Sequence, residues 1–175
     1  MSAHFQSSGP RSNAYSESKF TNWTSYDPFF AEARTALKRF DGRISIIPKF
    51  PHVIVIKSQL SQFIQACTRA DVRWRLERMP EASRKDLRAV FVLSGTRKQE
   101  KSWWSKLGCY GMYWRSCVFL FAYPFDLPWH YTRDDLRSFY LHNVLVHEVA
   151  HHIDRERVNG RKAKEAFAHA YVQKQ

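Results

Sequence analysis

The chain has 175 residues, a length typical of one compact domain. Its 28 lysines and arginines exceed its 16 aspartates and glutamates, and the resulting charge of +12 favours an anionic partner, most often nucleic acid. Hydrophobic residues make up 44% of the sequence, which excludes a chain that is disordered throughout. The longest strongly apolar run, residues 118–122, is too short for a membrane helix, so no membrane partner is expected.

The three cysteines exclude a disulfide-stapled scaffold, because their number is odd and a chain of this size can build its own core. The absence of a CxxC pair gives no support to a cysteine zinc knuckle. We expect free thiols in a reducing compartment, and the first twenty residues lack the apolar segment of a secretory signal. The expected location is therefore cytoplasmic. Seven serines in residues 1–26 predict a flexible tail, followed by one domain over residues 27–175.

Hydrophobic periodicity predicts the first elements. Apolar residues at helical spacing predict a helix over 28–40, with Pro28 in its first turn and Gly42 beyond its end. The β-branched run 53–56 predicts a buried strand. Residues 59–78 predict an amphipathic helix, since apolar and polar residues alternate at helical spacing before Pro80.

The middle of the chain predicts further strands. Residues 89–93 form a second apolar run, and a polar loop is expected over 95–101. Two more strands are predicted over 110–114 and 117–123, close enough together for a hairpin. An extended peptide can pair with a sheet edge, and the aromatic strand 110–114 is the candidate for that edge, with a packed core strand as the favoured alternative.

The last forty residues predict two helices. Thr132 and Asp134 are the candidate N-caps of the first helix, which is expected to run to Val158 before the stop signal Asn159-Gly160. The second helix is expected from about Arg161 to Gln173.

An HExxH sequence, residues 147–151, lies within the first of these helices. At about 100° per residue, His147 and His151 point within about 40° of each other, so two imidazoles can share a tetrahedral zinc ion. Glu148 points about 100° away from His147 and can accept a proton from a water on the metal. Five residues with three fixed also occur by chance, and two surface histidines on an amphipathic helix are the alternative.

The surroundings of the motif favour a metal site. The helix is apolar nearly all round, which predicts a buried helix whose histidines are not idle surface groups. Asp154 falls about 20° from His147, where a carboxylate can hydrogen-bond a ligating imidazole. His152 falls about 140° from His147 and is expected to pack or be solvated behind the site.

A catalytic zinc needs a third protein ligand, and the final helix offers Glu165 and His169, four residues apart. By helical rise, a strictly antiparallel helix pair favours His169. A crossed pair, with the longer reach of glutamate, allows Glu165. The spacing leaves both residues open.

HExxH followed by a glutamate on a second helix resembles the gluzincin metallopeptidases, and residues 165–171 resemble the glutamate helix of the lethal-factor type. The resemblance implies that Glu165 is the third ligand, and Asp154 also matches that group's pattern. It implies an α+β, zincin-like fold: a small mixed or antiparallel sheet with a backing helix, an active-site helix and a glutamate helix, similar to the minigluzincin core. The likeness is specific over about 140–172, topological over 50–125 and absent over 1–45.

Two features depart from the gluzincin pattern. Many gluzincins carry an acidic residue four positions after the ligand glutamate, where this chain has His169, so His169 is either a residue that supports the ligands or an alternative ligand. No tyrosine lies between the two helices to stabilise an oxyanion. Tyr131, Tyr140 and Tyr171 are the candidates, each with a core role as the alternative.

The function expected from these features is a zinc-dependent metallopeptidase, with one Zn²⁺ per chain, Glu148 as general base and a peptide or protein as substrate. Two rivals are a non-enzymatic nucleic-acid-binding protein with a zincin-like fold and a DNA-associated, Spartan-type protease with His169 as third ligand. Candidate nucleic-acid contacts are Arg97, Lys98, Trp103 and Trp104, where cations bracket two stacking aromatics; a solvated basic face is the alternative.

Overall fold

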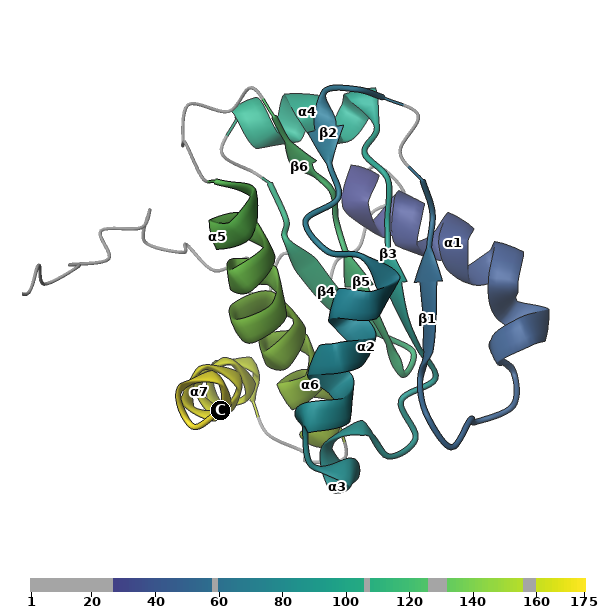
Figure 1. Ribbon diagram of the computed structural model, residues 1–175, viewed down its shortest axis with the longest axis vertical. Helices are drawn as coiled ribbons and strands as arrows, with labels where there is room; N and C mark the ends of the chain where they lie inside the picture. The colour runs from purple at the N-terminus through teal and green to yellow at the C-terminus, as the bar shows by residue number, and fades with distance from the viewer. Residues whose placement is uncertain (1–26, 58–59, 106–107, 126–131, 156–159) are drawn as a thin grey trace, which may run out of the picture.

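The computed structural model describes residues 27–57, 60–105, 108–125, 132–155 and 160–175, so the predicted tail, 1–26, lies outside the described residues. A four-stranded mixed sheet organises the fold, with strand order β1-β3-β5-β4 (Figure 1). Three strands are parallel: β1 (His52–Val55), β3 (Ala89–Val92) and β5 (Cys117–Leu120). The edge strand β4 (Gly111–Trp114) is antiparallel to β5. The expected α+β class with a small mixed sheet is confirmed, as is the hairpin.

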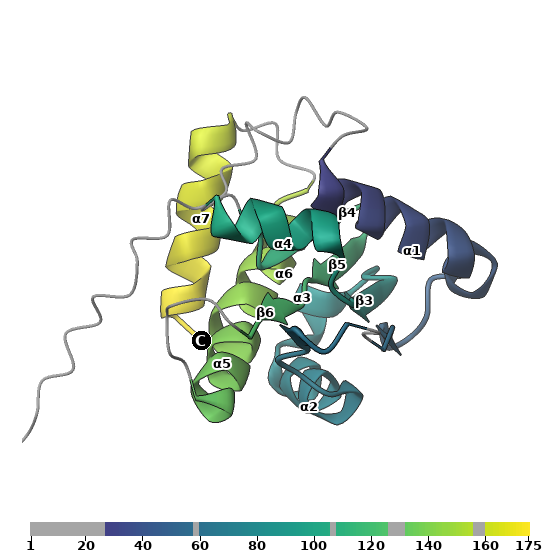
Figure 2. The same ribbon diagram turned by 90° about the horizontal axis from the view of Figure 1, so that it is seen from above.

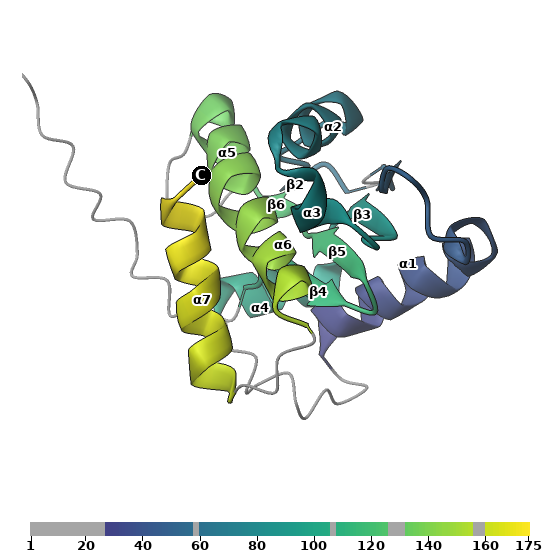
Figure 3. The same cartoon turned by 90° about the horizontal axis from the view of Figure 1, so that it is seen from below.

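Helices cover both faces of the sheet. Helix α1 (Pro28–Ile44) lies on one face, where Phe30 contacts Trp114 of β4 and Phe40 contacts Phe91 of β3 (Figure 2). The predicted helix is confirmed and continues past Gly42 to Ile44. Helix α2 (Arg69–Arg78) and the helical run that carries the HExxH motif cover the opposite face (Figure 3).

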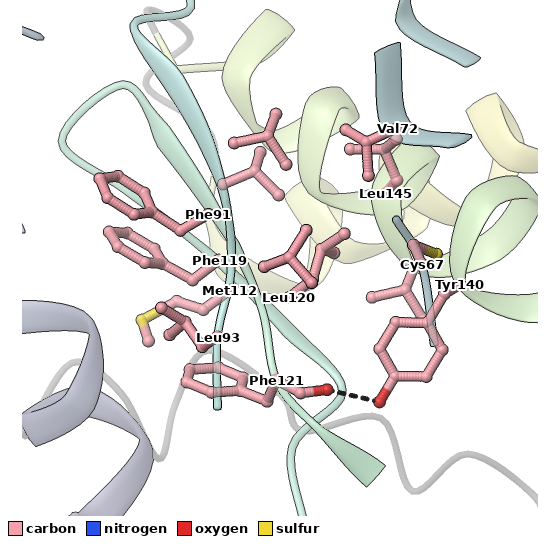
Figure 4. Packing of buried hydrophobic residues seen from close by; sticks show 14 of the residues in the cluster. Cys67, Val72, Phe91, Leu93, Met112, Phe119, Leu120, Phe121, Tyr140 and Leu145 are labelled. Carbon is pink, nitrogen blue, oxygen red and sulfur yellow. Dashed lines mark hydrogen bonds between the residues drawn. The ribbon is translucent and has the colours of Figure 1, made fainter. Parts of the chain in front are cut away.

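The core lies between these layers. Every residue of β3 and β5 is buried, as expected of parallel strands that are covered on both faces. Phe91 and Phe119 stack with their ring centroids 5.0 Å apart. The buried Tyr140 hydroxyl donates a hydrogen bond of 2.7 Å to the carbonyl of Phe121, which joins the helical layer to the sheet (Figure 4).

The prediction of one helix over 59–78 is wrong in its first half. A reciprocal capping box begins α2 at Arg69: the backbone N–H of Asp71 donates to the Thr68 hydroxyl, and that of Thr68 donates to the Asp71 carboxylate. Upstream, β2 (Phe63–Ile64) instead pairs antiparallel with β6 (Tyr123–Pro124).

The prediction of a polar loop over 95–101 is also wrong, because helix α4 (Arg97–Trp104) occupies most of it. Its N-terminus also has a reciprocal capping box. The Thr96 hydroxyl accepts a hydrogen bond from the backbone N–H of Gln99 at 3.3 Å, and the Gln99 side chain accepts one from the backbone N–H of Thr96 at 2.8 Å. A short helix, α3 (Glu81–Arg84), precedes β3.

The C-terminal region contains the predicted helices with one interruption. Helix α5 (Arg133–Phe139) leads through a π-helical turn, η2 (Tyr140–Val144), into α6 (Leu145–Ile153). Thr132 is the N-cap of α5, as predicted, since its hydroxyl accepts from the backbone of Asp135 at 3.1 Å. The α-helix ends at Ile153, short of the expected Val158.

The final helix, α7 (Arg161–Gln173), has the predicted bounds and packs against α6 (Figure 3). Within the described ranges, no helix combines the length and the apolar character that a membrane span requires. The fold thus brings α6, which carries the HExxH motif, beside α7, which carries Glu165 and His169.

Candidate metal centre

Helices α6 and α7 bring three potential ligand side chains together. Nε2 of His147 lies 3.0 Å from Nε2 of His151 and 3.4 Å from Oε2 of Glu165. Nε2 of His151 lies 3.5 Å from Oε1 of Glu165. Ligands at about 2.0–2.1 Å from a tetrahedral zinc ion lie roughly 3.3 Å from each other. The three atoms are therefore spaced as ligands of a single ion would be.

Packing holds α7 against α6 at this distance. Ala168 is fully buried, so its small side chain lets the two helix backbones approach closely. On the same helix, the Tyr171 hydroxyl lies 2.6 Å from the Ser83 hydroxyl of α3. These contacts hold the part of α7 that follows Glu165, so that Glu165 lies beside the two histidines of α6.

The electrostatics of the site suit a cation. Burial, followed by the neighbouring His147, lowers the pKa of His151 to about 4, so its imidazole is neutral at neutral pH and keeps the lone pair that a metal requires. Burial tends to raise the pKa of Glu165, but the hydrogen bond with His147 and the electrostatic interactions with the neighbouring histidines outweigh it and lower that pKa. Glu165 is therefore an anion, and both its oxygens are shielded from solvent.

His169 also reaches the centre. Its ring centroid is 5.0 Å from that of His147, and ligand atoms of His147, Glu165 and His169 all lie within 4.8 Å of one another, a grouping that is able to hold a metal ion. Both candidates for the third ligand are thus present. Glu165 forms close contacts with both motif histidines, whereas His169 is exposed and lies at the rim.

The Glu148 side chain is buried beside the edge strand. A Cβ atom placed on Gly111 of β4 would lie 2.5 Å from a methyl carbon of Val144, 3.1 Å from Cγ of Glu148 and 3.3 Å from its Oε1. A side chain at position 111 would overlap Val144 and crowd Glu148. Sequence reasoning did not single out Gly111, although an isolated glycine in a predicted strand signals a close approach.

His152 lies behind the site, as expected. It is fully buried, its Nε2–H donates to the carbonyl of Lys85 at 2.7 Å, and its Nδ1 accepts from the Tyr113 hydroxyl at 3.1 Å. Asp154 is also buried, directly after the last turn of α6. The two hydrogen bonds of His152 join the HExxH helix to β4 and to the residue after α3.

Two of the three candidate tyrosines are described, and the hydroxyl of each is bonded to a partner outside the metal centre. The prediction of Tyr140 as an oxyanion stabiliser is wrong, because its hydroxyl is buried and donates to the carbonyl of Phe121. The Tyr171 hydroxyl is bonded to Ser83 in α3. Tyr131 lies outside the described residues.

The candidate nucleic-acid contacts divide into core and surface. Trp103 is only 3% exposed and packs edge-on against Phe29 and Tyr110, so its prediction as a stacking residue is wrong. Helix α4 turns the next residue outward, and Trp104 is 51% exposed. Arg97 and Lys98 are exposed on the same helix.

No protein-family model, curated protein or solved structure matches the chain. The geometry and chemistry of the site are therefore the basis for assigning a function.

Proposed function

We propose that the chain is a zinc-dependent peptidase of the gluzincin type, with His147, His151 and Glu165 as the metal ligands. One observation carries the proposal: the ligand atoms of the three side chains, one carboxylate and two imidazoles, are 3.0–3.5 Å apart. The arrangement of an antiparallel edge strand beside the HExxH helix, followed by a glutamate helix, supports a zincin-like fold.

The chemistry divides between metal and protein. A bound zinc ion supplies Lewis acidity and lowers the pKa of a water to about 7. Glu148 accepts a proton from the attacking water and delivers it to the leaving amine, a role that suits a buried carboxylate next to a ligand histidine. His147, His151 and Glu165 would hold the zinc ion beside Glu148.

The edge strand supplies a binding surface for an extended substrate. Strand β4 pairs with β5 on one side and contains Gly111, which lies against Glu148. A peptide that pairs with the other side of β4 runs past the general base. We therefore propose peptides in extended conformation as the substrate class.

Metal analysis of the purified chain tests the ligand assignment. We expect about one zinc ion per chain in the unsubstituted protein and in Gln173→Ala, an exposed control on α7, and a loss of bound zinc in Glu165→Ala. His169→Ala should keep its zinc. The reverse pattern would make His169 the third ligand, as in the Spartan-type rival, and zinc near zero in the unsubstituted protein would remove the basis of the proposal.

A second variant tests the mechanism apart from the metal. Glu148→Gln should keep its zinc and lose at least about 100-fold in cleavage of a quenched-fluorescence peptide library, because the amide cannot accept the proton. Undiminished cleavage by this variant would contradict the role of Glu148.

A further inference from the structure

A hollow of about 230 Å³ lies on the opposite side of the sheet from the metal centre, between α1 and the turn that joins β4 to β5. Figures 2 and 3 show β4 near the beginning of α1. Three cationic side chains, one carboxylate and two apolar side chains line it: Arg34, Lys38, Arg115, Asp41, Leu37 and Trp114.

The charge of this hollow is positive. Its carboxylate, Asp41, is 3.1 Å from the guanidinium of Arg88 and is neutralised by it. In the part of the chain that the structure describes, no ion pair engages Arg34, Lys38 or Arg115. Three cations therefore face solvent around one depression.

The backbone at the rim is strained. Arg115 and Ser116, the two residues of the hairpin turn, have φ angles of 50° and 57°. Such a turn favours Asn-Gly, because other side chains resist the left-handed region. The Arg115 guanidinium lies 4.9 Å from the centroid of the Trp114 ring, which holds it over the hollow. Strain of this kind gathers at functional sites, and the arginine is the residue that it positions.

We propose that this hollow binds phosphate groups of a nucleic-acid strand. Arginine matches phosphate oxygens with its planar fork, and Arg34 and Lys38 stand one helical turn apart, about 6 Å, on the same side of α1. A row of cations fits the repeated charges of a strand better than a single carboxylate, and the net charge of +12 draws such a polyanion to the protein.

The proposal does not depend on the peptidase activity, because the hollow and the metal centre share no residue. The test uses the full chain with a fluorescein-labelled 20-nucleotide single strand, read by fluorescence anisotropy at several salt concentrations. The test variant is Arg34→Ala/Lys38→Ala/Arg115→Ala. The control is Lys49→Ala/Lys57→Ala/Arg69→Ala, which has the same net charge and exposed positions away from the hollow.

We expect the hollow variant to bind about tenfold or more weakly and the control to change by less than about twofold. The slope of log Kd against log salt should fall by about 2 in the hollow variant alone, since each phosphate contact on a single strand contributes about 0.7. Equal losses in both triple variants would reduce the effect to net charge and overturn the proposal. Absence of binding at low salt, or equal competition by polyglutamate or inorganic phosphate at the same charge concentration, would also overturn it.

Arg115→Asn separates binding from folding. Asparagine tolerates the left-handed region, so this variant should melt at the same or a higher temperature while it binds the strand more weakly. A lower melting temperature with unchanged binding would assign Arg115 a structural role and remove it from the proposed site.

Discussion

Gly111 is the position where the edge strand and the HExxH helix come closest. The missing side chain lets β4 lie against Val144 and Glu148, and both of these residues belong to the helical run on the same face of the sheet. Glu148, the proposed general base, and the strand proposed to bind substrate therefore lie in contact distance of each other at Gly111.

Gly111→Ala tests this close approach. The added methyl group overlaps Val144 and presses on Glu148, so we expect a loss of about 1–3 kcal/mol in the free energy of unfolding and weaker peptide cleavage. Urea denaturation and the peptidase assay measure the two effects.

The control is Gly42→Ala, because a Cβ atom on Gly42 has no neighbour within 4 Å and the residue lies within α1. It should stabilise the protein by about 0.5–1 kcal/mol, the gain of alanine over glycine in a helix. A Gly111→Ala variant as stable and as active as the control would show that the strand moves aside at little cost.

Adjacent histidines in the motif region have different roles, and the sequence predicts this difference. Helical geometry alone separates His151, on the same side as His147, from His152, which the structure buries against Lys85 and Tyr113. The partners of His152 lie 39 and 67 residues away in the chain, and no local pattern indicates them. The direction of a side chain was predictable, and its tertiary partners were not.

At the scale of elements, the helical run from α5 to α6 contains a feature that periodicity does not reveal. The turn η2 has π-helical bonding, whereas the hydrophobic pattern predicts one continuous helix. A π turn adds a residue to one turn and changes the direction of all later side chains relative to earlier ones. Within η2, the Tyr140 hydroxyl donates to the carbonyl of Phe121, a tertiary contact that the hydrophobic pattern does not indicate.

The sequence contains signals for the beginnings of two helices that our predictions did not use. The T-x-x-D and T-x-x-Q patterns at Thr68 and Thr96 both form reciprocal capping boxes. The first capping box lies at the beginning of α2. The second lies at the beginning of α4, a helix rich in cationic residues. Composition suggested a loop there, but local hydrogen bonding at the N-terminus favoured a helix.

The contact between α7 and α3 provides a test at this scale. The Tyr171 and Ser83 hydroxyls lie 2.6 Å apart, and α7 also carries Glu165, so we expect Tyr171→Phe and Ser83→Ala each to cost about 1 kcal/mol of stability. The double variant should cost little more than either single one, because both remove the same hydrogen bond. Thermal or urea unfolding of the four proteins gives this coupling.

The same variants decide between two roles for Tyr171. A structural contact predicts equal effects of Tyr171→Phe and Ser83→Ala on zinc affinity and on kcat. An oxyanion stabiliser predicts a fall of about 100-fold in kcat for Tyr171→Phe alone. That second pattern would return Tyr171 to the catalytic residues.

At the scale of the whole molecule, the fold redistributes the basic residues that the sequence presents in runs. The runs along 69–88 and 97–106 attract notice in the sequence, yet the hollow combines Arg34 and Lys38 of α1 with Arg115 of the hairpin. The sheet brings these distant segments together, since Phe30 of α1 packs on Trp114 of β4. The sequence predicted an anionic partner and placed its contacts at residues 97–104, whereas the proposed hollow combines segments that only the tertiary structure brings together.

The three cysteines report on the integrity of the same core. All are buried free thiols in the structure, and they lie in different parts of the fold. Burial raises the pKa of Cys67 to about 12 and that of Cys117 to about 11, and it raises the pKa of Cys109 well above its ordinary value. The thiolate is the reactive form, so none of the three is nucleophilic near neutral pH.

We therefore expect no cysteine to react with iodoacetamide at pH 8 in the native protein and all three to react in urea, as counted by mass spectrometry. Ser105→Cys, at an exposed position after α4, serves as a control that labels at once. Because access requires opening of the core, the three native thiols should react at one common rate that rises with denaturant. A single thiol that reacts much faster than the other two would contradict this expectation and would mark a part of the fold that opens separately from the rest.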